Sequence, residues 1–546
     1  MARAAETRSD LPSRARQQRL DRAFNPRTVA VVGDKAAMGY LWLRSMSTFQ
    51  GKVYSVQIDP NEIPGIEALG VPNYPSLLDI PDEVDYVVCA VPRQVSPRIL
   101  ADCIEKGVGA VPLFTAGFAE TETEEGIRLQ EEIAATARSA GLLLIGPNCM
   151  GIYNRRLGVR HSWEQPAGDA GNVGFISQSG THCINFSLVG DRQGIRCSKA
   201  VSFGNAVVLD AADYLEYMTD DAETEVIGLY LEGVQEARRF FSVLRKAARR
   251  KPVVVWKGGV TRAGARAIYS HTAALATAPA LWDAAMRQAG VVRTESLDDT
   301  IDAVKALVYC TPGTGYRVGL VAMTGGQSVV ITDAFEGEGL EVPLLTAASY
   351  GKLSGFFNII GGSYRNPLDS GGTIGWGFLP QNLEKLLTIL DEDENVDAVA
   401  IEVNAGFLAR RMRDPPQADG ILDALLDTLS AHRERSQKPF IAITHPGHLE
   451  DVTAMVRSRL LERNIPPFAS FEASSRILCR QWSVASRSFR FGSCGRSFLR
   501  SVLISSSGSS PTTYLSNAGL LVRLRTSRAS RAAPPSSRLA MYSLWI

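Results

Sequence analysis

The sequence has no apolar run of the about 18 residues that a membrane-spanning helix needs. Its eight cysteines include no CxxC pair, which argues against a disulfide framework or a zinc site and fits a reducing cytoplasm. Residues 1–20 are rich in arginine but lack an apolar core, so they resemble neither a secretory signal nor a transit peptide. We therefore expect a cytoplasmic protein without a metal site, whose residues 1–22 form a disordered arm.

Acidic residues and lysine are both missing after Glu472. Eleven of the 58 basic residues, all arginine, lie in that segment, so the body before it has a net charge near −10. A body that acidic has no electrostatic footprint for nucleic acid. Residues 476–546 are rich in serine and arginine, and they look like a frame-shifted or non-homologous end; a basic interaction tail is the alternative.

Between these ends, apolar segments of strand length alternate with helical segments such as Glu124–Ala140. This alternation predicts an α/β fold with parallel, doubly wound sheets, in which ligands bind beyond the carboxyl ends of the strands. The pattern restarts twice, which predicts three consecutive domains over residues 23–155, 156–309 and 310–475, followed by the disordered tail. The expected strands are 28–33, 53–58, 85–91, 109–114, 142–145, 172–176, 226–231, 253–256, 316–323, 398–403 and 440–444.

The loop after the first expected strand, Gly33 to Gly39, could hold a diphosphate at the start of a helix, although it is not a GxGxxG motif. Asp59 lies 26 positions beyond Gly33, at the end of the second strand. Its carboxylate would suit a ribose contact in an NAD domain, or it caps the following turn. A dinucleotide site and a plain strand–helix turn both remain open.

The run Ser177-Gln178-Ser179-Gly180-Thr181 follows a strand and precedes an apolar helical segment. Backbone N–H groups and the hydroxyls of Ser179 and Thr181 would form an anion site at that helix start. Ordinary helix capping by serine is the alternative. Position 177 is serine, so the G-x-S-x-G elbow is absent, which argues against Ser179 as a hydrolase nucleophile.

His271 follows the strand that ends in Lys257-Gly258-Gly259. We expect its imidazole to be exposed on a loop before a helix, where it can accept and donate a phosphoryl group; a surface or capping histidine is the alternative. Glu232 ends another strand, and its carboxylate could orient an imidazole or be a solvated loop residue. Cys149 could lie near a thiol ligand or be a buried structural cysteine.

In this order, the motifs resemble those of the acyl-CoA synthetases that form a nucleoside diphosphate as product, a family related to the alpha subunit of succinyl-CoA synthetase. The resemblance covers about residues 24–475. It rests on Ala116-Gly117-Phe118-Ala119-Glu120, Gly146-Pro147-Asn148-Cys149-Met150-Gly151, Ser177 to Gly180, Leu231-Glu232-Gly233, Lys257-Gly258-Gly259, Ala263-Gly264-Ala265-Arg266-Ala267, Ser270-His271-Thr272 and Asn366-Pro367-Leu368-Asp369.

The resemblance implies a Rossmann-like CoA-binding domain followed by two flavodoxin-like ligase domains. It implies that His271 is phosphorylated during the reaction and that Glu232 holds it. The phosphate site is implied at Ser179, Gly180 and Thr181. The CoA site is implied at Gly33, Pro60, Val91, Pro92, Ala116, Gly117, Asn148 and Cys149.

The implied reaction is that of an acid–thiol ligase: acyl-CoA, phosphate and ADP give a carboxylate, CoA and ATP. No ATP-grasp pattern follows residue 475. The resemblance therefore implies that ADP or ATP and Mg²⁺ bind a separate, beta-type ATP-grasp subunit in a heteromer, and that the substrate is a small carboxylic acid or its acyl-CoA.

The sequence departs from the family pattern at several positions. Ala273 and Thr277 stand where the family prefers glycine, and Gly325-Gly326-Gln327-Ser328 replaces a longer glycine-rich run. Asp34 would repel a CoA diphosphate unless its carboxylate is turned away. Two other functions therefore stay open: a non-catalytic CoA or acyl-CoA binding module, and, from Gly33 and Asp59, an NAD-dependent oxidoreductase.

Overall fold

The computed structural model describes residues 13–272, 279–310, 313, 315–375, 380–404, 406, 415–445 and 449–480. All of these residues fall in one compact unit of the chain. The predicted tail lies outside the described residues beyond position 480. In the described part of the chain, no helix has both the length and the apolar character needed to cross a membrane.

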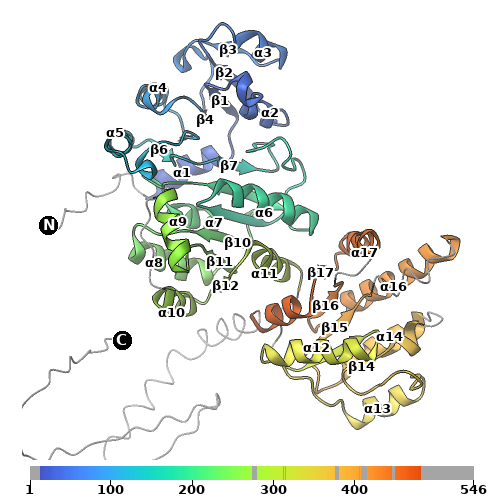
Figure 1. The fold of residues 1–546 in the computed structure, drawn as a ribbon. Coiled ribbons are helices and arrows are strands. Elements are labelled where there is room, and N and C mark those ends of the chain that lie inside the picture. Colours follow the sequence, from blue (N-terminus) through green and yellow to red (C-terminus); the bar gives the residue numbers. More distant parts are fainter. Residues whose placement is uncertain are drawn as a thin grey trace, which may run out of the picture. The chain divides into compact units, whose positions relative to one another are not determined.

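The first domain contains a parallel sheet of six strands in the order β3-β2-β1-β4-β5-β6 (Figure 1). Alternate residues of β1 pack into different clusters, Val29 and Val31 on one face and Ala30 and Val32 on the other, so both faces are covered. The strands are β1 (Thr28–Val32), β2 (Lys52–Val56), β3 (Asn73–Tyr74), β4 (Tyr86–Cys89), β5 (Ala110–Pro112) and β6 (Leu143–Ile145). The helices are α1 (Ser13–Phe24), η1 (Ala36–Met38), α2 (Leu41–Ser45), α3 (Ile63–Ala68), η2 (Leu77–Asp79), η3 (Arg93–Val95), α4 (Ser96–Lys106), η4 (Ala119–Thr121) and α5 (Glu124–Ala140).

Helix α1 corrects the prediction of a disordered arm over residues 1–22, because residues 13–24 are helical. Leu20 and Phe24 are fully buried, and the Phe24 ring stacks on Tyr217 of the second domain with centroids 4.5 Å apart. On its polar side, Arg16 pairs with Asp213 at 3.0 Å. The helix is mostly polar, so its stability comes from these tertiary contacts, which composition did not reveal.

The second domain contains six strands in the order β12-β11-β10-β8-β9-β7. Five strands run parallel, and β7 pairs with β9 in the antiparallel sense. The strands are β7 (Gly151–Asn154), β8 (Val173–Ser177), β9 (Cys197–Ser202), β10 (Val226–Leu231), β11 (Val253–Lys257) and β12 (Val292–Thr294). The helices are α6 (Gly180–Arg192), α7 (Ala211–Asp220), α8 (Ala237–Ala248), α9 (Arg262–Thr272), α10 (Pro279–Ala289) and α11 (Leu297–Tyr309).

Strand β7 lies before the predicted boundary near residue 155, yet it belongs to the second sheet. A single hydrophobic cluster joins the two domains: Val31 and Ile145 of the first sheet share it with Ile176 and Leu229 of the second. Since this core is continuous, the facing loops of the first two domains are held in a fixed relation.

Within its described residues, the third domain contains five parallel strands in the order β14-β13-β15-β16-β17. Residues 471–480 are also helical, and Ile477 and Leu478 are buried, so the ordered chain extends beyond the predicted tail start at 476. The strands are β13 (Val318–Ala322), β14 (Leu368–Asp369), β15 (Ala398–Glu402), β16 (Phe440–Ile443) and β17 (Pro467–Phe468). The helices are α12 (Gly325–Gly337), α13 (Ala347–Ser354), η5 (Gly371–Gly375), α14 (Pro380–Glu392), α16 (Pro415–Arg435) and α17 (Glu450–Glu462).

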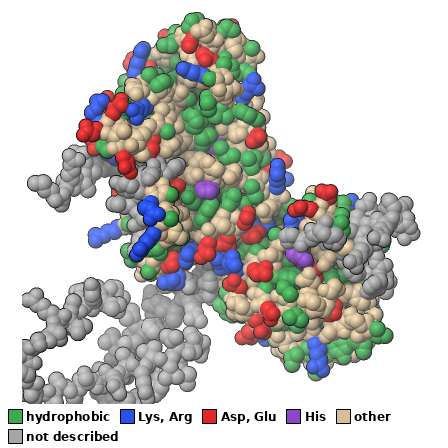
Figure 2. Space-filling model, in the orientation of Figure 1, with side chains coloured by type: hydrophobic (Ala, Val, Ile, Leu, Met, Phe, Trp, Pro, Cys, Tyr) green, Lys and Arg blue, Asp and Glu red, His purple; other side chains and the backbone are tan. Residues whose placement is uncertain are grey.

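Three sheets dominated by parallel strands confirm the predicted α/β fold class. In each sheet the carboxyl ends of the parallel strands lie at one edge, where ligand sites of such folds form. On the face shown in Figure 2, basic and acidic side chains are interspersed, and hydrophobic side chains gather over the middle of the first two domains.

Candidate active site

The loops at the carboxyl edge of the first sheet lie close together. A Cβ added to Gly33 would lie 2.7 Å from Val91 Cγ1. The Thr115 hydroxyl donates to the Val91 carbonyl at 2.5 Å, and Asn148 N–H donates to the Thr115 carbonyl at 3.1 Å. The structure therefore brings together the predicted CoA residues on the loops after β1, β4, β5 and β6. Of the remaining predicted residues, Pro60, Pro92 and Ala116 are exposed at this edge, and Gly117 is partly buried there.

Asp34 is turned away from this edge. Its carboxylate is buried, and the N–H groups of Trp42 and Leu43 both donate to its Oδ2 at 2.9 Å. The residue before α2, Tyr40, makes no side-chain cap, so Asp34 caps the helix in its place. Burial raises the pKa of Asp34, and the N–H groups of Leu43, Lys35 and Trp42 oppose that rise. The repulsion expected from Asp34 is therefore weakened by its position.

Replacing Asp34 with alanine should lower the free energy of unfolding by about 1–3 kcal/mol, because two buried N–H groups lose their acceptor. Asparagine keeps an acceptor oxygen, so Asp34→Asn should retain most of the stability. Thermal melts of both variants would measure this. Equal losses in the two variants would show that charge, rather than the cap, stabilises the helix.

Asp59 follows β2 and is partly exposed. Its Oδ1 accepts hydrogen bonds from both N–H and Nδ2 of Asn61, each at 3.0 Å. The carboxylate thus closes the turn that follows β2. The capping interpretation accounts for the hydrogen bonds of this residue.

Cys149 is a buried structural cysteine, the second of the two predicted interpretations. Its side chain is 4% exposed, and its thiol lies 3.4 Å from the Ile145 carbonyl. Burial raises the pKa of Cys149 to about 12, so the thiol stays protonated at neutral pH. Cys149 therefore shapes the loop rather than reacting.

The loop after β8 starts helix α6 as the sequence predicts. Ser179 is the N-cap, and its hydroxyl accepts from His182 N–H at 3.3 Å. Ser177 supports the turn, since its hydroxyl accepts from Ser179 N–H at 3.1 Å. The N–H groups of Gly180 and Thr181, in the first turn, have no acceptor within their own helix and suit an anion.

Glu232 is buried at the end of β10, next to this loop. Gln178 Oε1 accepts from the N–H groups of Glu232 and Gly233, the second at 2.8 Å. The Tyr230 hydroxyl donates to Glu232 Oε1 at 3.4 Å. A solvated loop position, the alternative for Glu232, does not describe this carboxylate.

An aromatic cluster beside Glu232 was not predicted. The ring centroid of His182 lies 4.4 Å from that of Tyr230 and 4.5 Å from that of Trp256. Burial lowers the pKa of His182, and the charge of Glu232 opposes that effect. The first turn of α6 therefore carries a neutral imidazole at neutral pH. Only the position of His182, three residues after the N-cap, could have signalled this from the sequence.

The two loop systems meet. A Cβ on Gly180 would lie 2.7 Å from Met150 Cγ, in the loop after β6. Met150 N–H donates to the Ser202 hydroxyl at 3.1 Å, and Asn205 N–H donates to the Pro147 carbonyl at 3.0 Å. The start of α6 thus lies directly against the Gly146–Gly151 motif of the first domain.

His271 does not lie on a loop. Residues 262–272 form helix α9, and the His271 backbone is in its last turn. Thr261 caps the helix, with its hydroxyl accepting from Gly264 N–H at 3.0 Å, and the alanines and arginines that follow are strong helix formers. Helix α9 lies beside η4, just after the Ala116–Gly117 loop. The His271 side chain, Ala273 and Thr277 lie outside the described part of the structure.

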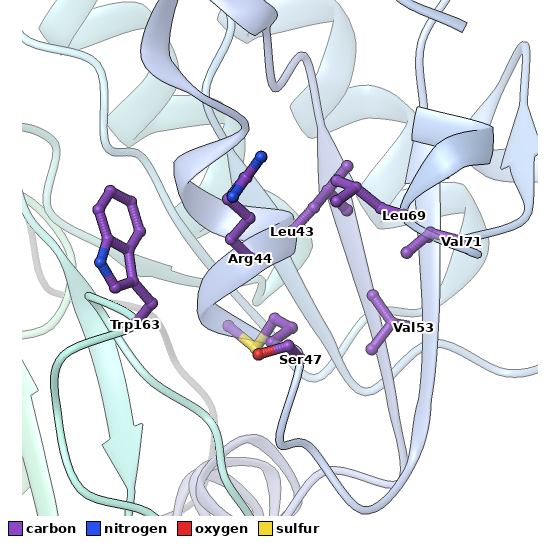
Figure 3. A pocket seen from close by; sticks show the side chains of 8 residues that line it. Leu43, Arg44, Ser47, Val53, Leu69, Val71 and Trp163 are labelled. Carbon is purple, nitrogen blue, oxygen red and sulfur yellow. The ribbon is translucent and has the colours of Figure 1, made fainter. Parts of the chain in front are cut away.

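A cavity of about 430 Å³ has lining residues that all differ from the predicted site residues (Figure 3). It is lined by the carboxyl-terminal half of α2 and by Val53 near the start of β2, opposite the ligand edge. Trp163 and Arg44 flank it. Within the described residues, no group of three His, Cys, Asp or Glu side chains is arranged to hold a metal ion.

Comparisons with known proteins agree with this geometry. A family model described as a CoA binding domain matches residues 27–155, and one described as a succinyl-CoA ligase like flavodoxin domain matches residues 170–307. The chain is 33% identical, over 82% of its length and 94% of the relative, to the alpha subunit of acetate–CoA ligase (ADP-forming) II of Pyrococcus furiosus. It is 35% identical to acetate–CoA ligase (ADP-forming) I of Archaeoglobus fulgidus, over 70% of this chain but only 54% of that protein.

Among solved structures, the dinucleotide forming acetyl-coenzyme A synthetase 1 of Ca. Korarchaeum cryptofilum, in complex with phosphate and ADP, superposes with a TM-score of 0.72. The identity is 28%, over 86% of this chain and 97% of that chain. The fold and these matches are those of CoA-binding acid–thiol ligases. The chain belongs to the family of ADP-forming acyl-CoA ligases, which confirms the resemblance found in the sequence.

Proposed function

We propose that this chain is the CoA-binding, phosphohistidine-bearing subunit of an acyl-CoA synthetase that converts acyl-CoA, phosphate and ADP into a carboxylate, CoA and ATP. The observation that carries the proposal is the contact of Gly180 with Met150. It sets a helix start suited to phosphate against the loop that carries the predicted CoA residues Asn148 and Cys149. Phosphate and a thioester must meet in this way for the first step.

The first domain fits CoA. Gly33 has no side chain between β1 and the ligand, and its φ of 83° suits glycine. Lys35 is exposed on the same loop, where its ammonium can pair with the diphosphate, while the Asp34 carboxylate is turned inward. Val91 and Asn148 border this edge on neighbouring loops. We assign the remaining CoA contacts to Pro60, Pro92, Ala116 and Gly117.

In the first step, a phosphate oxygen attacks the thioester carbonyl carbon, the C–S bond breaks, and CoA leaves as a thiolate that takes up a proton. An acyl phosphate is formed. The N–H groups of Gly180 and Thr181 and the hydroxyl of Ser179 hold the phosphate and offset its negative charge.

In the second step, a ring nitrogen of His271 attacks the phosphorus of the acyl phosphate, the bond to the acyl oxygen breaks, and the carboxylate leaves. Glu232 accepts a hydrogen bond from the other ring nitrogen and balances the charge that develops on the imidazole. ADP then takes the phosphoryl group and yields ATP. A beta-type ATP-grasp partner subunit binds the nucleotide with its Mg²⁺, and the alpha-subunit names of the relatives support such a heteromer.

The test is to incubate the full chain with acyl-CoA and labelled phosphate and to measure acid-labile, base-stable label on the protein. We expect label on the chain and none on the His271→Ala variant. His432→Gln is the matched control, because this histidine is buried in the third domain and should leave labelling unchanged. An unlabelled chain that still binds CoA would support the non-catalytic binding module instead.

A further inference from the structure

Lys257 is a buried lysine at the end of β11, and its side chain has no role in the steps above. The residue is 6% exposed. Its Nζ donates to the Glu232 carbonyl at 2.8 Å and to the carbonyl of the next residue in the chain, Gly258, at 2.5 Å. The ammonium also lies over the Trp282 ring, 5.7 Å from the centroid. Burying a cation is costly, so this position needs these compensating contacts.

The register of the sheet explains the contact. Leu231 of β10 pairs with Lys257 of β11, so the next residue, Glu232, lies beside the lysine. Burial lowers the pKa of Lys257, and the charge of Glu232 opposes that shift. Lys257 thus ties the two strand ends together.

The Glu232 peptide is held from its other side as well. Gln178 Oε1 accepts from the N–H groups of Glu232 and Gly233, while Lys257 donates to the Glu232 carbonyl. Gly258 adds a close approach, because a Cβ there would lie 2.5 Å from the Tyr230 hydroxyl, which itself donates to Glu232. Both polar groups of this backbone position and its carboxylate are therefore fixed by neighbours.

We infer that Lys257 is a positioning residue for Glu232: it anchors the main chain of Glu232 and so fixes the place from which the carboxylate would bond the imidazole of His271 in the proposed reaction. The inference rests on the proposed phosphohistidine function. It assigns the lysine of the Lys257-Gly258-Gly259 motif a role through Glu232 rather than a contact with substrate. Methionine at 257 would keep the buried carbon chain but remove both hydrogen bonds.

The experiment measures the rate at which labelled acetyl phosphate phosphorylates the full chain. In Lys257→Met, the saturating rate constant should fall by about 10- to 100-fold, because a small displacement of a group that orients a reacting residue slows a reaction to about this extent. The acetyl phosphate concentration at half-maximal rate and the CoA Kd should stay unchanged. Lys257→Arg should restore part of the rate, since it can donate to the same carbonyls.

Lys251→Met is the matched control. Lys251 lies just before the same strand, and its Nζ donates to the carbonyls of Met218 and Asp221 at 2.7 and 2.6 Å. Both lysine-to-methionine variants should lower thermal stability, because each removes hydrogen bonds to two main-chain carbonyls. Lys251→Met should leave the labelling rate unchanged. Equal slowing in both variants, or a wild-type rate in Lys257→Met, would overturn the positioning role. No label on the wild-type chain would instead overturn the proposed function and, with it, this inference.

Discussion

Glutamine in place of Glu232 is expected to slow phosphorylation of His271 by about 10²- to 10⁴-fold, as loss of an imidazole-orienting carboxylate does in other catalytic sites. Glutamine retains the size of the side chain and its contact with Tyr230, but it loses the charge that balances a developing imidazolium. The CoA site lies on other loops, so CoA affinity should not change. Labelling with acetyl phosphate and a CoA titration would measure the two effects.

Glu225→Gln is the matched control for this variant. Glu225 immediately precedes the other end of β10, and on the surface its Oε2 accepts a hydrogen bond from Asn172 Nδ2 at 2.6 Å. It should leave both measurements unchanged. If Glu232→Gln were labelled at the wild-type rate, the imidazole of His271 would have to be oriented by another group, and the assignment of Glu232 would fail.

The elements that the sequence predicted best are those buried on all sides. Residues 226–231 form β10 within the predicted bounds, and α5 spans the predicted Glu124–Ala140. A strand in the middle of a parallel sheet has helices on both faces and is therefore apolar throughout. Such a strand can be recognised from its own residues, without knowledge of its neighbours. Strand β7 was missed as part of the second sheet because its place depends on pairing with β9, which follows more than 40 residues later.

The candidate site was predicted in its positions but not in its contacts. Ser179 and Glu232 follow strands of a parallel sheet, so topology alone brings them to one edge. The direction of the Asp34 carboxylate and the packing of His182 depend on side-chain conformation and on residues far away in the sequence. The same is true of Lys257, whose contact with Glu232 follows from the register of β10 and β11.

The contact between the first two domains leads to the second large prediction, the replacement of Gly204 by alanine. A Cβ at Gly204 would lie 2.2 Å from the Asn148 carbonyl oxygen and 2.3 Å from that of Pro147, and both are main-chain atoms. Its φ of 48° adds strain for any residue with a side chain. The loop after β6 must therefore move, and the free energy of unfolding should fall by about 2–4 kcal/mol.

A loss of function distinguishes Gly204→Ala from a variant that only lowers stability. Gly107→Ala is the control, because Gly107 has a similar positive φ of +70° but no atom within 4 Å of its added Cβ. It should lose only about 1 kcal/mol of unfolding free energy and bind CoA normally.

Gly204→Ala displaces Asn148 and the neighbouring Met150, against which Gly180 packs, so it should weaken CoA binding and slow labelling of His271 together. Thermal melts, CoA titration and labelling at a temperature where both variants are folded would test this. Normal CoA binding with slow labelling would show that the loop after β6 and the start of α6 act independently. It would contradict the proposal that phosphate and the thioester meet where Gly180 packs against Met150.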